Sequence, residues 1–240
     1  MLSLRAAALS DIGRVRHENE DRFLLDESNR IFGIADGVGG LPGGGEAAQR
    51  ATEEIIAGLK DRSAETEPDL VTLTRHANQA VANLGATISR SMGIGTTLTF
   101  GCIHGTSMLI GHVGDSRCYL LRNGQLTQVT EDHSVENDAK LARARGEIVH
   151  FHDMNRNALT RCIGQPSPLE VDVIRWPLRA GDRFLFCTDG VTRLIPDTEL
   201  TILLAKADSP KTGVSEIVSL AVRRGGPDNA TAVIVVVDSV

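Results

Sequence analysis

The chain has 240 residues, a formal net charge of -6 and 41% hydrophobic content, which is enough for one substantial core. We therefore expect residues 1–240 to form a single domain, large enough to be a catalytic domain. The acidic balance argues against nucleic acid as a partner, because a phosphate-binding surface needs a basic stripe, and only 3% of the residues are aromatic.

The chain also lacks the signatures of a membrane or secreted protein. Its longest apolar run, residues 232–237, is far shorter than the roughly 20 residues that span a bilayer. The first residues turn polar too early for a convincing signal peptide. The cysteines are widely spaced and form no C-x-x-C pair, which argues against a disulfide framework or a zinc ribbon. We expect a cytoplasmic protein with no membrane segment.

In chain order, a charged stretch precedes a strand in "GRVRHENEDRFLLD", and a second strand is predicted at residues 31–35. Apolar residues at helical spacing then predict helices over residues 46–59 and 70–90. After the helices the period changes to two, which predicts strands at residues 96–103, 108–113, 117–121 and 125–130. Asn123-Gly124 between the last two runs is typical of a type I′ hairpin, which needs positive φ at both positions.

The C-terminal third returns to mixed elements. Strands are predicted at residues 183–187 and 232–237, and a helix at residues 212–224 that stops at Gly225-Gly226-Pro227. Strands joined by hairpins with helices in separate blocks favour an α+β fold with antiparallel sheets over alternating βαβ units. Met92 and Met108 are expected to fill gaps in the core.

Four aspartates recur in one local pattern, at a predicted strand edge and next to or near a glycine. They are Asp36, Asp115, Asp189 and Asp228. A single Asp-Gly pair is most often a tight turn. However, Asp36 leads into "VGGLPGGGEAA" and Asp189 into a polar, proline-containing stretch, so neither pair joins two matched strands. The pattern favours a functional site built at strand ends.

Carboxylates gathered at one point repel each other, at a cost of about 4 kcal/mol per pair at 4 Å and an effective dielectric near 20. A divalent cation reverses that sign. Oxygen ligands without histidine or cysteine select Mg²⁺ or Mn²⁺ over Zn²⁺. The N-terminal stretch adds the acids Glu18, Glu20 and Asp21, and also Arg16, whose planar fork suits a phosphate group; the alternative is a solvated charged loop.

These residues carry a resemblance. The stretches "RHENED", "ADGVGG", "GIGTTLTF", "GHVGDSRCYLLRNGQL", "TEDHS", "NALTRCIG", "FLFCTDGV" and "GGPDNATAVIV" resemble, in the same order, the motifs of metal-dependent protein phosphatases of type 2C, in particular the compact bacterial form. The similarity runs from about residue 10 to the C-terminus. It implies two antiparallel sheets packed as a sandwich and flanked by helices, with a flap segment near residues 135–151.

The resemblance also implies a role for individual residues. Asp36 matches the carboxylate that bridges two metal ions, Gly37 offers its carbonyl to one of them, and Glu20 contacts the second ion largely through water. Asp189 and Asp228 complete the shell of the first ion. Asp115 with Asp189 matches a third, weaker metal site of bacterial members. Arg16 matches the arginine that holds the substrate phosphate.

The function implied is hydrolysis of phosphoserine or phosphothreonine in proteins by a water activated by Mn²⁺ or Mg²⁺, with no phosphoenzyme intermediate. The expected partners are phosphorylated proteins and a cognate Ser/Thr kinase. Val38 stands where some members have a histidine after the Asp-Gly pair, which leaves the general acid unassigned. His150 and His152 could ligate a metal but fit solvated flap residues better.

Two alternatives stay open at this stage. Cys187 and Arg193 have the C-x-x-G-x-x-R spacing of a thiolate phosphatase, although Cys187 ends an apolar run and lacks the depressed pKa environment that a nucleophilic thiolate needs. The chain could also be a non-catalytic module of the same fold that binds phosphoproteins. Thr96 and Thr97 are candidates for supporting the site, while Arg117 and Arg161 are expected to anchor turns.

Overall fold

The structure is a computed structural model that describes residues 2–60, 66–165 and 168–240. The described residues form two antiparallel five-stranded sheets. The first sheet has the order β1 (Ser3–Asp11), β10 (Ala230–Ser239), β9 (Arg183–Cys187), β6 (Arg117–Arg122), β7 (Gln125–Gln128). The second has the order β2 (Arg22–Asp26), β3 (Ile31–Ala35), β4 (Leu98–His104), β5 (Ser107–Val113), β8 (Asp172–Pro177).

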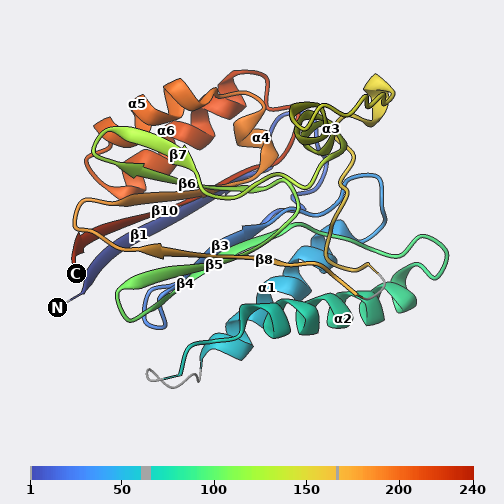
Figure 1. Cartoon of the computed structure of the whole chain (residues 1–240), viewed down its shortest axis with the longest axis horizontal. Helices are drawn as coiled ribbons and strands as arrows, with labels where there is room; N and C mark the ends of the chain where they lie inside the picture. The colour runs from blue at the N-terminus through green and yellow to red at the C-terminus, as the bar shows by residue number, and fades with distance from the viewer. Residues whose placement is uncertain (1, 61–65, 166–167) are drawn as a thin grey trace.

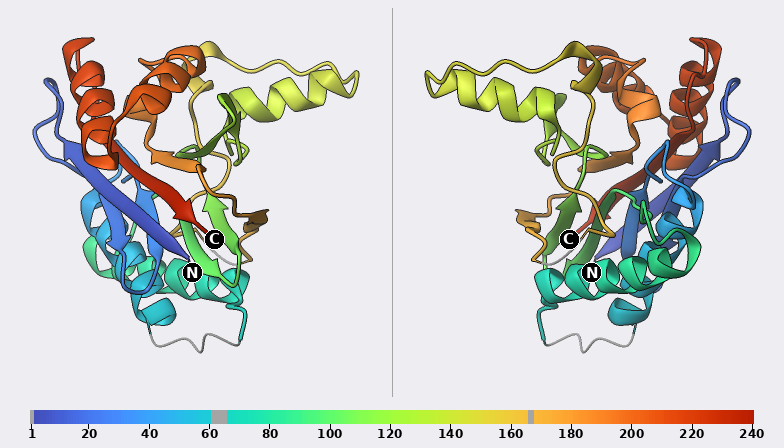
Figure 2. Two further views of the ribbon diagram at one scale, coloured as in Figure 1. Left: turned by 90° about the vertical axis from the view of Figure 1, so that its left-hand side faces the viewer. Right: turned by 90° about the vertical axis from the view of Figure 1, so that its right-hand side faces the viewer.

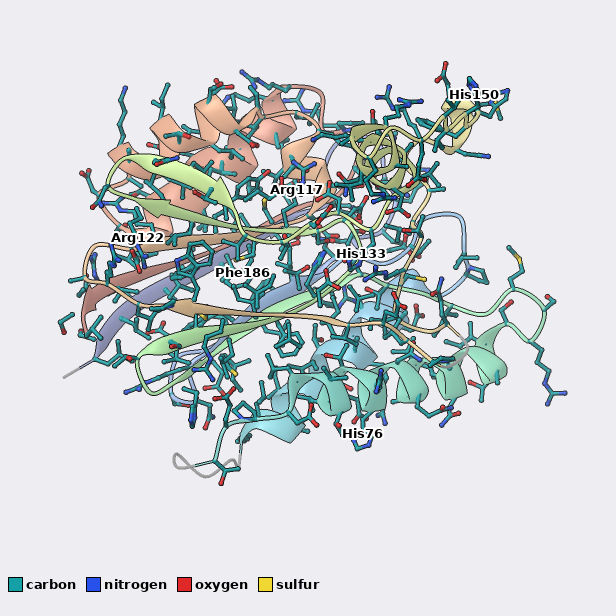
Figure 3. All side chains as sticks on the ribbon, viewed as in Figure 1. His76, Arg117, Arg122, His133, His150 and Phe186 are labelled. Atoms are coloured by element: carbon teal, nitrogen blue, oxygen red, sulfur yellow. The ribbon has the colours of Figure 1, made fainter. Side chains whose placement is uncertain are left out.

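The two sheets pack face to face and helices cover their outer faces, so the molecule has four layers (Figure 1). Phe32 from the second sheet and Phe184 and Phe186 from the first are fully buried in the core between them. Phe186 can be seen between the two sheets in Figure 3. α1 (Gly44–Lys60) and α2 (Leu70–Ile88) bury their apolar faces on the second sheet. α5 (Asp197–Lys206) and α6 (Pro210–Arg223) cover the first sheet. The predicted α+β sandwich is confirmed.

Local chemistry explains where the elements begin and turn. The Asp69 side chain accepts from the Thr72 amide at 3.0 Å and caps α2. α6 begins two residues earlier than predicted because Ser209 and Thr212 form a reciprocal capping box ahead of Pro210. Between β6 and β7, Asn123 and Gly124 have φ of 53° and 78°, as a type I′ turn requires.

Several elements were not predicted. β1 pairs with β10 along its whole length, from Ser3 opposite Ser239 to Asp11 opposite Ala230, so the two ends of the chain lie side by side (Figure 1). β8, α4 (Asp189–Thr192) and α5 were also missed. Met108 is buried as expected, but the prediction for Met92 is wrong, because its side chain lies in the α2–β4 connection and is 59% exposed.

The flap segment stands apart from the sandwich. α3 (Val135–Ala144) and the 3-10 turn η1 (Asp153–Asn155) project away from the two sheets (Figure 2). α3 buries only Ala139 and Ala142, so most of its surface faces solvent. Among the residues that the structure describes, no helix is both long and apolar enough to cross a membrane.

Candidate metal centre

Every predicted site residue except Glu20 lines one cavity of about 560 Å³. The cavity lies where β3, β5 and β9 end and β10 begins, so both sheets contribute to it. The predicted residues along its wall are Arg16, Asp36, Gly37, Asp115, Asp189 and Asp228. The aspartates that repeat along the sequence therefore meet in space, as their position at strand ends suggested.

Asp36 follows β3 and is held by the start of the neighbouring strand. Its amide donates to Thr97 Oγ1 at 3.0 Å, and its carbonyl accepts from the Thr97 amide at 2.8 Å and from Thr96 Oγ1 at 2.9 Å. Thr97 Oγ1 also lies 2.7 Å from Ser116 Oγ. The threonines that were candidates for site support thus fix the backbone from which the Asp36 carboxylate projects.

Gly37 and Glu20 meet at the beginning of α1. A Cβ on Gly37 would lie 2.5 Å from the Gly44 carbonyl carbon and 2.9 Å from Glu20 Cβ, so no larger residue fits there. A Cβ on Gly44 would lie 2.5 Å from Glu20 Oε1. The Glu20 carboxylate therefore packs against the first turn of α1, where the helix dipole favours negative charge. Glu20 lies directly behind Gly37 and lines a neighbouring cavity.

Asp189 and Asp228 are joined through the backbone around Asn229. Asp189 opens α4 immediately after Thr188. A Cβ on the next residue, Gly190, would lie 1.9 Å from the Asn229 carbonyl oxygen, so the two segments can approach this closely only at a glycine. Asn229 Oδ1 accepts from the Glu20 amide at 2.9 Å, and the Asn229 amide donates to Asp228 Oδ1 at 2.9 Å. The acidic segments at both ends of the chain are therefore fixed to each other.

Asp21 is a further acidic residue of the site, which the sequence analysis noted only as one of several acids. It is 3% exposed, and its Oδ2 accepts from Thr188 Oγ1 at 3.0 Å and Thr231 Oγ1 at 2.6 Å. Its Oδ1 is buried without a hydrogen-bond partner. Burial, followed by the nearby charges of Asp189 and Asp228, raises the pKa of Asp21 to about 7.

The same two causes act on the carboxylates along the cavity wall. Loss of solvation, with repulsion from the other aspartates, raises the pKa of Asp36 well above its usual value. Loss of solvation and the charge of Asp189 raise the pKa of Asp115 to about 7. The pKa of Asp189 is raised chiefly by burial, which Arg193 partly offsets. The site is thus a cluster of negative charges short of positive charge.

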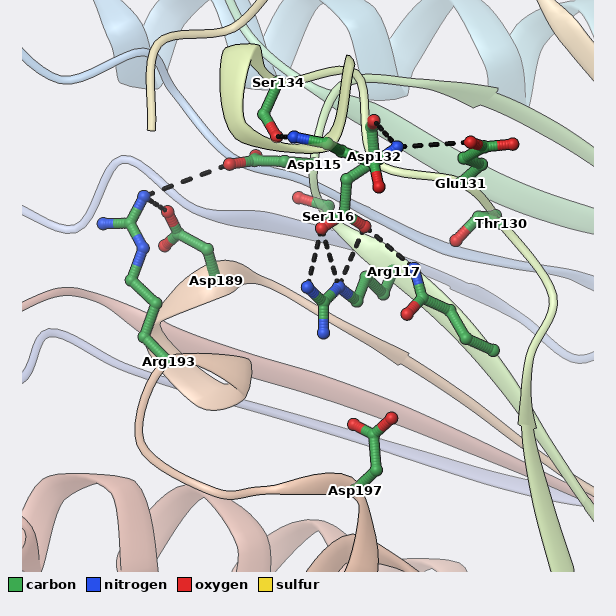
Figure 4. A network of polar contacts seen from close by, with 12 residues as sticks. Asp115, Ser116, Arg117, Thr130, Glu131, Asp132, Ser134, Asp189, Arg193 and Asp197 are labelled. Carbon is green, nitrogen blue, oxygen red and sulfur yellow. Dashed lines mark hydrogen bonds and ion pairs between the residues drawn. The ribbon is translucent and has the colours of Figure 1, made fainter. Parts of the chain in front are cut away.

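Arginines supply part of that missing charge. Arg16 Nη2 lies 2.8 Å from Asp228 Oδ2. Arg193 forms an ion pair with Asp189, one helical turn before it, and its Nη2 lies 4.0 Å from Asp115 Oδ2 (Figure 4). In residues 2–60, 66–165 and 168–240 no three acidic, histidine or cysteine side chains already close into a metal shell. The guanidinium groups of Arg16 and Arg193 instead pair with the carboxylates of Asp228 and Asp189.

The chemistry of this site fits hard divalent cations. Its donors are carboxylate and carbonyl oxygens, which select Mg²⁺ or Mn²⁺. Asp21 Oδ1 is buried without a hydrogen-bond partner, so one oxygen of the carboxylate cluster is left uncompensated. A divalent ion would relieve the repulsion that raises the carboxyl pKa values. The same residues without a cation would be a costly arrangement.

The turn that carries Asp115 is supported by the segment before the flap. Gly114, with φ of 115°, donates its amide to His133 Nδ1 at 3.0 Å and accepts from the His133 amide at 2.8 Å. Arg117 was expected to anchor this turn. It instead forms a forked pair with Asp132, with Nη2 to Oδ2 at 2.6 Å (Figure 4). It also donates to Tyr119 Oη at 2.8 Å. Arg117 therefore holds the segment that holds Gly114.

The thiolate alternative fails on burial. Cys187 is 0% exposed and lies in the centre of the first sheet, where β9 pairs with both β10 and β6. Burial raises the pKa of its thiol above the ordinary value, which is opposite to what a nucleophilic cysteine needs. Arg193 faces Asp189 and Asp115. The spacing that suggested this mechanism is coincidental.

The histidine pair of the flap is also accounted for. His150 and His152 are both exposed, and His150 lies on the projecting segment (Figure 3). His152 Nδ1 accepts from the Met154 amide at 3.3 Å and caps η1. Neither residue lines the cavity that holds Asp36. The interpretation as solvated flap residues agrees with these positions.

The fold and the site together define a class: an enzyme with an α-β-β-α sandwich and a strand-end carboxylate cluster suited to divalent ions. Comparison with known proteins gives the family. Residues 14–213 match the protein phosphatase 2C family. The serine/threonine phosphatase stp of Listeria welshimeri is 33% identical over 97% of this chain and 95% of its own length. The chain belongs to the protein phosphatase 2C family.

Solved structures agree. The serine/threonine phosphatase PstP/Ppp of Mycobacterium tuberculosis superposes with a TM-score of 0.81 at 32% identity, covering 99% of this chain and 100% of that one. The catalytic domain of PstP in complex with 2 manganese ions gives a TM-score of 0.82 at 32% identity, covering 99% of each chain. This protein is a bacterial-type, metal-dependent protein-serine/threonine phosphatase with a divalent metal cofactor, and its substrates are phosphoproteins.

Proposed function

We propose that this chain is one catalytic domain that hydrolyses phosphoserine and phosphothreonine in proteins at the cavity between the sheet ends. The observation that carries the proposal is the convergence of Asp36, Asp115, Asp189 and Asp228 from both sheets on one cavity with Arg16 at its wall. Such a cluster holds cations, and cations hold a phosphate ester. Relatives in Listeria and Mycobacterium are named serine/threonine phosphatases, which supports phosphoserine and phosphothreonine as the substrate class.

The metal ligands are proposed residue by residue. Asp36 would be shared by the two ions, the Gly37 carbonyl would hold one of them, Glu20 would contact the second largely through water, and Asp189 with Asp228 would hold the first. When bound, the ions lower the pKa of a water so that it becomes the nucleophile, and they offset charge on the phosphoryl oxygens. Manganese is the cation we favour, because the PstP catalytic domain was solved with 2 manganese ions. No phosphoenzyme intermediate is needed.

Arg16 is proposed to bind the substrate phosphate. Its side chain is 37% exposed at the cavity and pairs with Asp228 at 2.8 Å. A planar guanidinium donates two parallel hydrogen bonds to phosphate oxygens. Once Asp228 has a metal ion as its partner, Arg16 is free to turn toward the ester.

The leaving group needs a proton from solvent. Val38 follows the Asp36-Gly37 pair, and among the described residues along the cavity no histidine is present. The thiol of Cys162, which also lines the cavity, has a pKa that burial raises to about 11, so it stays protonated but is a weak acid. We therefore assign the proton donation to a water in the cavity.

The flap is proposed to contact the protein part of the substrate. Asn157, Ala158 and Leu159, where the flap returns to the sandwich, line the acidic cavity. A second cavity of about 600 Å³ lies beneath α3 beside Phe151 and Arg161. A cognate Ser/Thr kinase or its targets in the cytoplasm would supply the phosphoproteins. The cytoplasmic location remains a prediction.

A panel of phosphoserine, phosphothreonine and phosphotyrosine peptides tests this function. The protein is assayed with EDTA, with Mn²⁺ and with Mg²⁺, and phosphate release is measured. We expect release from the serine and threonine peptides only when a divalent ion is present. Peptide binding without any release, in the presence of Mn²⁺, would instead identify a non-catalytic module.

Variants separate the site from the fold. Asp36→Asn and Asp189→Asn should each abolish phosphate release and reduce Mn²⁺ binding while the circular dichroism spectrum is retained. Asp238→Asn is the matched control, because Asp238 pairs with Arg5 at 2.7 Å at the far end of the first sheet. Full activity in either site variant would contradict the proposed ligand set.

A further inference from the structure

Arg193 is a cation at the cavity that none of the proposed steps uses. It caps the short helix α4, and its amide donates to the Asp189 carbonyl at 2.9 Å. This turn of helix places its side chain next to the Asp189 carboxylate, as residues four apart on a helix are neighbours. Its Nη2 also lies 4.0 Å from Asp115 Oδ2, so one guanidinium faces both acids (Figure 4).

The two acids are brought close by strand pairing and need a cation between them. Asp115 lies between β5 of the second sheet and β6 of the first, and Asp189 follows β9, in which Cys187 pairs with Arg117 of β6, so the backbone holds the two segments side by side. Like charges this close are unfavourable unless a positive group lies between them. The guanidinium of Arg193 fills this role in the structure.

The resemblance in the sequence implies a third, weaker ion at this same pair of acids, Asp115 and Asp189. A divalent ion and the guanidinium cannot both occupy the position between Asp115 and Asp189. We propose that Arg193 is a built-in cation that takes this position, so that the protein binds two ions tightly and a third only by displacing Arg193. The inference rests on the proposed function, because it concerns the same site.

Arg193 and a third ion compete for Asp115 and Asp189, and the position of Arg193 both favours it and limits how tightly it holds them. It is attached to the same helix as Asp189, so it is always present at the acid pair, whereas a third ion must arrive from solution. However, its side chain is 43% exposed and can turn outward, so the competition is moderate. A hydrogen-bonded charge pair of this kind corresponds to about a tenfold change in ion affinity.

Counting bound ions tests the proposal without any assay of activity. Metal-free protein is titrated with Mn²⁺, and free Mn²⁺ is measured by electron paramagnetic resonance. We expect the third binding midpoint of Arg193→Gln to lie about tenfold below that of the wild type. The second midpoint should stay within about twofold, and the first should also be lower, because Arg193 pairs with Asp189, a proposed ligand of the first ion. Arg193→Ala, which removes both the charge and the length, should show the same shift.

The double variant Arg193→Gln/Asp115→Asn tests where the third Mn²⁺ ion binds. Loss of Asp115 should abolish the gain in affinity for the third ion that Arg193→Gln produces. Arg50→Gln is the control: Arg50 forms an equivalent pair with Glu54 at 2.6 Å, also four residues away, with its side chain 46% exposed, but on α1 outside the acidic cavity. It should leave all midpoints unchanged.

Two results would overturn the proposal: equal third midpoints in the wild type and both Arg193 variants, or a gain that persists in the double variant. Neither affects the proposed function. Conversely, a wild-type protein that binds fewer than two ions and releases no phosphate contradicts the proposed function itself. The two failures are therefore distinguishable when phosphate release is measured beside the Mn²⁺ titration.

Discussion

Replacing Asp21 by asparagine should stabilise the metal-free protein near neutral pH and weaken the stabilisation that Mn²⁺ provides. Asp21 is 3% exposed, its Oδ2 accepts from two threonine hydroxyls, and its Oδ1 has no partner. The charged form is therefore poorly solvated, and the pKa of the carboxyl is raised from 3.8 to about 7. Asparagine keeps an oxygen acceptor for the threonines but carries no charge.

The sign follows from proton uptake. Between pH 3.8 and about pH 7 the folded protein holds a proton on Asp21 that the unfolded chain has lost. The stability that protonated Asp21 confers is therefore complete below pH 3.8, the pKa of this carboxyl in the unfolded chain. It is lost as the pH rises through about 7, the pKa in the folded protein. The loss is about 1.4 kcal/mol per pH unit. From pH 5 to pH 7 this amounts to at most about 3 kcal/mol for the wild type relative to the variant.

Urea denaturation in EDTA at several pH values between 5 and 8 measures this difference. Asp36, Asp115 and Asp189 titrate in both proteins. Because the charge of Asp21 helps to raise the pKa of Asp36, the difference between the variant and the wild type reports Asp21 together with its coupling to Asp36. Asp238→Asn is a control that should run parallel to the wild type. Parallel curves for Asp21→Asn would show that the buried carboxyl does not titrate as described. With Mn²⁺ added, the variant should gain less stability than the wild type.

Three further predictions concern the neighbouring chemistry. Gly190→Ala should cost more than about 2 kcal/mol in the free energy of unfolding, because its Cβ would lie 1.9 Å from the Asn229 carbonyl oxygen, whereas Gly45→Ala, with its nearest atom at 3.6 Å, should be tolerated in thermal denaturation. Iodoacetamide should leave activity unchanged while EDTA abolishes it, because the Cys187 thiol is buried and protonated; inactivation that follows alkylation of Cys187 would contradict this. Val38→His should raise the ratio of phosphoserine-peptide to p-nitrophenyl phosphate turnover by about tenfold, because only the alkoxide leaving group needs a proton donor; an unchanged ratio would mean that a residue here cannot reach the leaving oxygen.

The sequence was sufficient for features that depend on neighbouring residues. Helix periodicity located α1 and α2, and the turn chemistry of Asn123-Gly124 located the β6–β7 hairpin. The position of acidic residues at strand ends predicted a shared site, because antiparallel strands in a sandwich bring their ends to a common edge. Here local chemistry and the final structure agree.

Features that depend on distant residues could not be predicted in this way. β1 is rich in alanine and shows a weak alternation, and it becomes a strand because Ser3–Asp11 pairs with Ala230–Ser239 at the other end of the chain. The same limit applies to Met92, whose apolar side chain follows α2 but finds no surface to cover. Propensity alone does not contain this pairing information.

Arg193 illustrates a different limit. Its spacing to Cys187 matched a thiolate motif, whereas its spacing to Asp189 is the one that forms a contact. The second spacing is informative only if residues 189–192 are known to form a helix, and a helix this short has no periodicity to detect. A motif read from sequence therefore needs the element that carries it before its residues can be assigned.

The rigid sandwich explains why a charge cluster of this kind can persist. Asp21, Asp36, Asp115, Asp189 and Asp228 belong to strand ends whose backbones are paired on at least one side, so repulsion between their carboxylates cannot simply move them apart. The repulsion is instead compensated by threonine hydroxyls, by Arg16 and Arg193, and in the active protein by divalent ions. Arg16 and Arg193 each pair with a carboxylate that we propose as a metal ligand, so under that proposal metal loading and the release of Arg16 toward substrate would be parts of one equilibrium.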